Sequence, residues 1–425
     1  MLELLDLRDG GERLEPTRLE PDPAVVETVR GILERVRADG DDALVELAMK
    51  LDGADLRDRG LVVPPEDFAG AEHETPRELK GAIDALVERL SELHARQLPV
   101  EWWDERDGVR AGETVRPLRS VGCYVPGGRA LYPSTVCMTV VPAVAAGVEE
   151  IVLTTPPQTD GSVAAPVLYA SVRAGATRVV RCGGAQAVAA MAFGTDSVPR
   201  VDRIVGPGNV YVTEAKRQLA GVVGIDGIAG PSELVVVADE TADADIAAAD
   251  LIAQAEHDPE ARTHLVTTDA GLVDRVRRAL DRSLVGARRK EIAEKALARA
   301  RAVLVRDLDH AAAVVDDLAG EHLLILVPDP RAFLRTVRNA GAVFLGEWSA
   351  VPFGDYGVWS NHVLPTAGTA RFTSGLRAAD FVTVRPVVQI TREAVASFAD
   401  QAATLARAEG LEGHARAVEL RRERA

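Results

Sequence analysis

The chain has 425 residues, of which 47% are hydrophobic and 27% are charged, and its formal net charge at pH 7 is −16. This length can bury more than one hydrophobic core, so two or more domains are expected. The acidic balance argues against a nucleic-acid partner, because phosphates are neutralised by clustered Lys and Arg. No run of about eighteen apolar residues occurs, so no membrane span is predicted. The short acidic N-terminus is unlike a signal peptide.

The chain contains 3 cysteines, each among Gly, Val or Ala residues, at Cys123, Cys137 and Cys182. No CxxC or Cys/His spacing links them, so a metal site built from cysteines is not expected. They are predicted to be small buried residues in a reducing compartment rather than catalytic thiolates. The cytoplasm is therefore the expected location, and a small molecule is the expected ligand.

The first quarter of the chain is predicted to be helical. Residues 1–20 carry little pattern and are expected to form an extended arm, whereas apolar residues recur at spacings of three and four over 21–98. His73 and His94 lie among charged residues in this region and are predicted to be exposed. The segment 115–125 is predicted to be one strand.

Short apolar segments then alternate with helical ones. Strands are predicted at 150–154, 178–182 and 203–205, and Gly-rich turns at 183–186 and 206–209. This alternation indicates βαβ units and a parallel sheet, whose ligands bind at the carboxyl ends of strands. No G-x-G-x-x-G motif occurs, so the usual dinucleotide fingerprint is absent. From the pattern alone, the glycines either admit a phosphate or ribose closely or simply form tight turns.

A second α/β series follows. Its predicted strands are 234–237, 264–267, 302–305, 322–326 and 342–345. Between the first two of these, a helix is predicted to open near Asp243 and to end before Pro259. The segment 354–365 is polar and irregular, as functional loops often are.

The C-terminal region is predicted to form a helical hairpin. A helix over about 391–407 is followed by a turn at 409–414 and a short basic helix. This hairpin has the character of an appendage that packs on another surface.

Gln254 and His257 are three residues apart on a predicted helix, so they project side by side. An amide oxygen and an imidazole nitrogen make half of a metal site, although such a pair is more often two hydrogen-bonded or exposed side chains. Similar groups recur at Glu321 and His322; at Asp355, Asn361 and His362; and at Glu409 and His414. Imidazole, carboxylate and amide donors together suit zinc or a similar ion.

Glu321 and His322 open a predicted strand, where adjacent side chains point to opposite faces unless the backbone bends. As two titratable groups they can serve as acid and base near neutral pH.

Eight stretches along nearly the whole chain resemble histidinol dehydrogenases. They are 122–134, 183–186, 206–209, 229–233, 254–257, 321–323, 354–356 and 361–366. Their order and spacing carry the resemblance, because no single stretch is specific enough. The chain departs from the family at Gly320, where Pro is common, and at 357–359, which is bulkier than the small residues expected.

The resemblance implies oxidation of L-histidinol through L-histidinal to L-histidine, with reduction of two NAD+. It also implies one zinc ion per subunit of a homodimer, held by Gln254, His257, Asp355 and His414, of which His414 and Glu409 come from the other subunit. Glu321 and His322 are the implied catalytic residues. The implied substrate contacts are Ser232, Gln254, His257, His322, Asp355, His362, Glu409 and His414, and the implied NAD contacts are Tyr124, Gln186 and Asn209.

The implied fold is α/β, with two incomplete Rossmann-like parallel-sheet domains. Its expected parts are an arm at 1–20, a zinc and substrate domain at 21–123 and 232–376, an NAD domain at 124–231, and a helical dimerisation arm at 377–425. Neither nucleic acid nor membrane is an expected partner.

Three alternatives stay open from the sequence. One is a related NAD-dependent dehydrogenase of a small polar diol such as a dihydroxypropane sulfonate, although an anionic sulfonate would favour added Arg or Lys near the site. A second is a zinc hydrolase without NAD, which would leave Tyr124, Gln186 and Asn209 without a task. A third is a zinc- or nucleotide-binding protein that does not turn over.

Overall fold

The computed structural model describes residues 2–10, 14, 16, 20–127 and 131–425. The remaining residues of the predicted arm, and 128–130 of the Gly-rich stretch, lie outside the described residues. The chain divides into two compact units, the larger formed by Met1–Gln97 with Leu118–Phe381 and the smaller by Leu98–Pro117 with Val382–Ala425. Among the described residues, no helix combines the length and apolar character needed to cross a bilayer.

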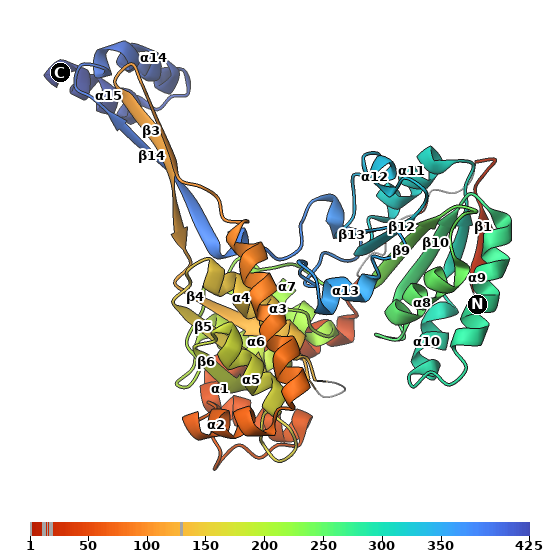
Figure 1. Cartoon of the computed structure of the whole chain (residues 1–425). Coiled ribbons are helices and arrows are strands. Elements are labelled where there is room, and N and C mark those ends of the chain that lie inside the picture. The colour runs from red at the N-terminus through yellow and green to blue at the C-terminus, as the bar shows by residue number, and fades with distance from the viewer. Residues whose placement is uncertain (1, 11–13, 15, 17–19, 128–130) are drawn as a thin grey trace. The chain divides into compact units, whose positions relative to one another are not determined.

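The larger unit contains a five-stranded parallel sheet in the order β6-β5-β4-β7-β8 (Figure 1). Its strands are β4 (Ser120–Tyr124), β5 (Glu150–Thr155), β6 (Arg178–Arg181), β7 (Arg203–Val205) and β8 (Gly224–Ile225). Successive strands run outward from β4 in one direction and then from β7 in the other. A topological switch point therefore lies between the carboxyl ends of β4 and β7, where α/β sheets commonly bind ligands.

Helices surround this first sheet. They are α1 (Pro23–Leu47), η1 (Ala48–Asp52), α2 (Pro65–Glu74), α3 (Arg77–Ala95), α4 (Pro133–Ala145), α5 (Ala165–Ala174), α6 (Gly184–Phe193) and α7 (Val210–Leu219). The apolar face of α1, with Val29, Leu33 and Val36, shares a core with α6 and α7. Helices α1 to α3 therefore pack against the helices of the first sheet.

A second parallel sheet has six strands in the order β1-β11-β10-β9-β12-β13. The strands are β1 (Glu3–Asp6), β9 (Glu233–Ala238), β10 (Arg262–Thr267), β11 (Arg301–Leu304), β12 (His322–Leu326) and β13 (Ala342–Leu345). The predicted N-terminal arm thus contributes β1, which pairs in parallel with β11. Its short pattern gives no local indication of this pairing.

Apolar cores cover both faces of the second sheet. Along β9, Leu234 and Val236 pack into one core, and Val235 and Val237 into the other, as the two-residue period of a strand requires. Helices lie on both faces (Figure 1). They are α8 (Ala244–Ala255), α9 (Ala270–Ser283), α10 (Lys290–Leu297), α11 (Leu308–Leu318), α12 (Pro330–Leu334) and α13 (Val351–Tyr356), followed by η2 (Thr369–Arg371) and η3 (Ala378–Phe381).

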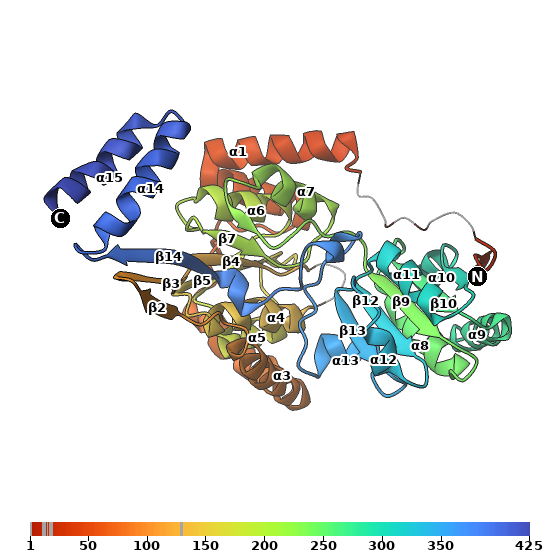
Figure 2. The same cartoon turned by 90° about the horizontal axis from the view of Figure 1, so that it is seen from above.

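The smaller unit is an antiparallel sheet with a helical hairpin (Figure 2). It consists of β2 (Trp102–Arg106), β3 (Val109–Pro117), β14 (Val382–Ile390), α14 (Val395–Ala408) and α15 (Glu412–Arg424). The single strand predicted over 115–125 was wrong, because its two halves belong to β3 and β4 in different sheets. The strand β14 was not predicted, because its side chains are largely exposed and so lack a clear inward-facing pattern.

Candidate functional site

Glu321 and His322 both contact the peptide backbone of Glu233. The Glu321 carboxylate accepts a hydrogen bond from Glu233 N at 2.9 Å, and His322 Nδ1 lies 3.1 Å from Glu233 O. Because a carbonyl only accepts, Nδ1 carries the hydrogen and Nε2 is the basic nitrogen. Glu321 Oε2 and His322 Nδ1 are 3.5 Å apart. The two side chains can approach each other because Glu321 precedes β12, and outside a strand successive side chains need not point to opposite faces.

This pair lies at the amino end of β12, beside the amino end of β9. Ser232, immediately before β9, is partly buried at the same end. The expectation that ligand-binding residues gather at carboxyl strand ends therefore applies to the turns of the first sheet and not to this pair.

The surroundings of His322 favour its charged form. Burial lowers the pKa of His322, but the adjacent Glu321 carboxylate, supported by Asp355, outweighs this effect and raises the pKa to about 9. The buried imidazole of His322 therefore carries a proton at neutral pH. The pair therefore has the chemistry of an acid and base coupled across 3.5 Å.

Gln254 and Asp355 come from helices that contact each other. The first backbone amide of α13, at Val351, donates to the Asp250 carboxylate of α8 at 2.9 Å. Burial raises the pKa of Tyr356, and the charges of Asp355 and Glu256 add to the rise. The side chains of Gln254 and Asp355 are both buried.

His257 differs from its prediction. The helix opens as expected with the Asp243 cap, but it ends at Ala255, so His257 follows the helix in an exposed turn. Its backbone amide donates to Gln254 O at 3.3 Å, which keeps the turn tight. The C-cap residue of this helix is Glu256, three residues before Pro259. The spacing of the apolar residues did not predict this early end.

The donor types of Gln254, His257 and Asp355 fit zinc, since they offer an amide oxygen, an imidazole nitrogen and a carboxylate oxygen. The burial of Gln254 and Asp355 near the contact of α8 and α13 supports that fit. In the part of the chain that is described, no group of three or more His, Cys, Asp or Glu side chains is placed to hold a metal ion.

His362 contacts a helix of the first sheet. Its Nε2 lies 3.2 Å from Thr135 Oγ1 on α4. Burial lowers the pKa of His362, which keeps the ring neutral despite the nearby carboxylates. Thr135 was not predicted, because nothing in its local sequence relates it to residue 362.

Asn361 and His94 hold the turn that carries His362. The Asn361 amide donates to Met138 O at 2.7 Å and lies 3.2 Å from His94 Nε2, while His94 Nδ1 lies 2.8 Å from Gln97 Oε1. His94 is fully buried, so its predicted exposure was wrong. The apolar stripe of α3 could have revealed it, because His94 continues the spacing of four from Leu90.

The residues implied for NAD lie at the carboxyl ends of the first sheet. The Tyr124 side chain is buried, and its hydroxyl accepts a hydrogen bond from Gly184 N at 3.1 Å. Gln186 is also buried, and its Oε1 has no hydrogen-bond partner. Asn209 is exposed, and its Oδ1 caps α7 by accepting from Tyr211 N at 3.0 Å. Gln186 therefore has an unpaired acceptor oxygen, and the cap of α7 uses only the Oδ1 of Asn209.

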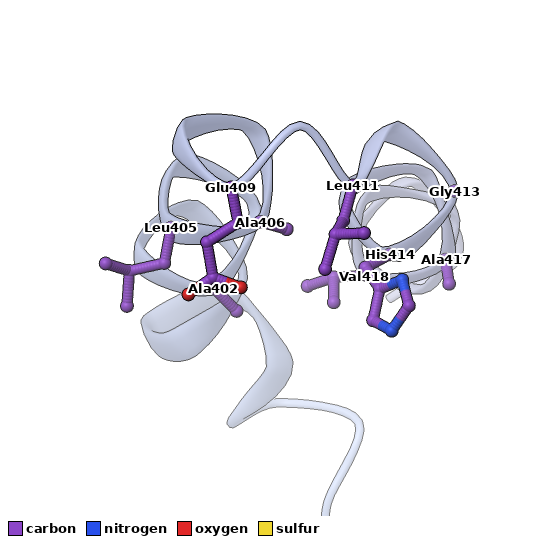
Figure 3. Close-up of a pocket in the computed structure, with 9 residues that line it drawn as sticks. All are labelled: Ala402, Leu405, Ala406, Glu409, Leu411, Gly413, His414, Ala417 and Val418. Carbon is purple, nitrogen blue, oxygen red and sulfur yellow. The ribbon is translucent and has the colours of Figure 1, made fainter.

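Glu409 and His414 belong to the smaller unit, where both are exposed. They line an open groove between α14 and α15, and Figure 3 shows both side chains on its lower side. Most of the remaining lining is apolar: Ala402, Leu405, Ala406, Leu411, Gly413, Ala417 and Val418. Within this unit, the hairpin presents a carboxylate and an imidazole beside exposed apolar side chains.

The bulky stretch after Asp355 is exposed rather than packed. Trp359 is 58% exposed, and Gly357 O accepts a hydrogen bond from Arg89 of α3 at 2.7 Å. The tryptophan is thus not part of a core.

Comparisons with known proteins agree over nearly the whole chain. The family model for histidinol dehydrogenase matches residues 17–422. A histidinol dehydrogenase of Thermus thermophilus is 46% identical over 401 residues, covering 94% of this chain and 95% of the relative. One of Halalkalibacterium halodurans is 45% identical over 397 residues, covering 93% of each. A crystal structure of histidinol dehydrogenase from Elizabethkingia anophelis matches with a TM-score of 0.93 at 32% identity, covering 99% of this chain and 98% of that chain.

Proposed function

The chain belongs to the histidinol dehydrogenase family of NAD-dependent oxidoreductases, and on that premise we propose that it oxidises L-histidinol through L-histidinal to L-histidine with reduction of two NAD+. The observation that carries the proposal is the pairing of Glu321 with His322, which both bond to backbone groups of Glu233. Each NAD+, when bound, accepts one hydride from the substrate carbon.

His322 removes the protons in this proposal. With Nδ1 bonded to Glu233 O, its Nε2 takes the hydroxyl proton as hydride leaves the alcohol carbon. The aldehyde must then be hydrated before a second hydride can leave. Glu321 is oriented by Glu233 N and activates that water by accepting its proton as the oxygen attacks the aldehyde carbon. His322 releases its first proton to solvent and then acts as base again.

We propose that zinc is held by Gln254, His257 and Asp355, with His414 supplied by a second copy in a homodimer. When bound, zinc orients the substrate and polarises its hydroxyl. His362 and Ser232 bind the rest of the substrate, and Glu409 of the second copy binds its amine. Support comes from the donor types, the burial of Gln254 and Asp355, and the exposed hairpin groove.

For the cofactor we propose Tyr124, Gln186 and Asn209 as contacts, supported by their place at the carboxyl ends of the first sheet. The cytoplasm is the proposed compartment. All three cysteines are unpaired and buried, which suits a reducing environment. Burial raises the pKa of Cys123 and of Cys137 to about 12, so a covalent thiolate step has no support from them.

The proposal is tested by supplying zinc-loaded protein with L-histidinol and NAD+ and counting NADH against histidine. Two NADH per histidine are expected. One NADH with accumulating aldehyde would contradict the hydration role of Glu321. No NADH from histidinol, with NADH from a polar diol, would favour the related dehydrogenase instead.

The rate of the first oxidation is expected to depend on pH through His322. The base is active when neutral, and a pKa raised to about 9 keeps it protonated at pH 7. Because the active form is then the minor one, kcat/KM should rise about tenfold per pH unit below that pKa. Activity is therefore lost as pH falls.

Glu321→Gln should move this profile to lower pH, because the carboxylate that raises the pKa of His322 is gone. The measurement is kcat/KM for aldehyde formation against pH, with the aldehyde trapped, in both proteins. Profiles with the same apparent pKa would contradict the coupling of the two side chains.

A further inference from the structure

The turn at 206–209 joins β7 to α7 at the switch point of the first sheet. Gly206 has φ +115°, and a Cβ placed there would lie 2.1 Å from Tyr124 O at the end of β4. The turn is therefore pressed against the neighbouring strand, and only glycine fits. At its other end, the exposed Asn209 caps α7.

A buried ion pair engages both backbone groups of Gly206. Lys216 Nζ donates to Gly206 O at 2.6 Å and to Asp226 Oδ1 at 2.6 Å. The other Asp226 oxygen accepts from Gly206 N at 2.7 Å. The side chains of Lys216 and Asp226 are only 4% and 10% exposed. Together they close a ring of hydrogen bonds around one peptide position.

A buried ion pair of this kind contributes little to the stability of the folded state by itself. Removing two charges from water costs several kcal/mol per ion, and well-packed apolar residues often replace a buried pair without loss. The effect of the pair here is to fix the backbone position of Gly206. It fixes the start of the turn, and Lys216 lies on the same helix that Asn209 caps, so it also fixes the turn relative to α7.

We propose that Lys216 and Asp226 are positioning residues that hold the 206–209 turn in the conformation that receives NAD+. The inference rests on the proposed function, because it takes the turn to be the cofactor contact. Neither side chain touches the cofactor. Losing the pair lets the turn and Asn209 relax, so NAD+ binding weakens while the Glu321 and His322 pair at the amino end of β12 is unaffected.

The test compares Lys216→Met and the uncharged double variant Lys216→Met/Asp226→Asn with a control on the same helix. The control is Glu214→Gln, because Glu214 is 3% exposed and pairs with Arg217 at 2.6 Å in α7 without contacting Gly206. Each protein is assayed for KM of NAD+, KM of histidinol, melting temperature and NAD+ affinity by calorimetry.

Both variants of the pair are expected to raise KM and Kd for NAD+ about tenfold, the effect expected from the loss of one well-placed contact. KM for histidinol should stay within about twofold of the wild-type value. Glu214→Gln should lower the melting temperature without changing either NAD+ constant. The double variant leaves no unpaired buried charge, so it serves if Lys216→Met fails to fold. An unchanged Kd for NAD+ in the double variant, or an equal rise in the control, would overturn the inference.

Failure of the proposed function has a different signature. Wild-type protein that binds NAD+ but makes no NADH from histidinol would refute the activity, and the calorimetric comparison would still decide the role of the pair. Wild-type protein that binds no NAD+ would overturn both.

Discussion

His322→Asn is expected to lower kcat by about 10³-fold, within the range that a general base contributes, while zinc content and NAD+ affinity stay near wild type. The Asn amide can still donate to Glu233 O, as Nδ1 does at 3.1 Å, so the local backbone contact is preserved. What is lost is the basic Nε2. Single-turnover formation of NADH, with zinc measured by atomic absorption, checks both parts.

The matched comparison is His264→Asn, which alters a histidine of β10 outside the proposed site. That variant should retain turnover. Wild-type rates in His322→Asn would refute the assignment of the base, and loss of zinc in the same variant would mean that His322 supports the metal site rather than the proton transfer.

His257→Ala and His414→Ala are each expected to lose most activity, and mixing them is expected to restore part of it. If each site takes His257 from one subunit and His414 from the other, a mixed dimer has one site with both histidines intact. Random reassociation of the two variants then recovers about a quarter of wild-type activity. The measurement is turnover and zinc content after joint unfolding and refolding.

His257→Ala mixed with His322→Asn supplies the control. Both residues are assigned to the same subunit's share of the site, so every site in that mixture lacks one of them and no recovery is expected. Failure of the first mixture to recover, or equal recovery in both, would contradict a site shared between subunits.

Much of the fold could be predicted from local patterns. The short apolar segments of β5, β7, β9 and β12 alternate with helical ones and indicated parallel strands, and the structure confirms them as parallel. Asp243 marked the start of α8, where its side chain caps the first turn. These features depend only on near neighbours in the chain. The strand β14 was not predicted, because its residues are almost all exposed and show no alternation of buried and exposed positions.

The candidate site was predicted unevenly. Residue types and family resemblance identified Glu321 and His322, but their mutual geometry depends on Glu233, which is 88 residues from Glu321 in the chain. Thr135 contacts His362 across 227 residues, and His94 approaches Asn361 across 267. Contacts between residues so far apart in the chain cannot be predicted from the local sequence pattern.

The sequence by itself determined most of the helices and the buried strands, because the periodic burial of apolar side chains is encoded by neighbours three or four residues apart in helices and two apart in strands. It did not determine the exposed strand β14. It also determined the residue types available for acid–base and metal chemistry. Only the tertiary structure decided that β1 joins the second sheet and that Glu321 and His322 both bond to the backbone of Glu233. It likewise decided that Lys216 and Asp226 close around Gly206. Each of these contacts joins groups from different elements, and their free energy is gained only when the packed cores bring those elements together.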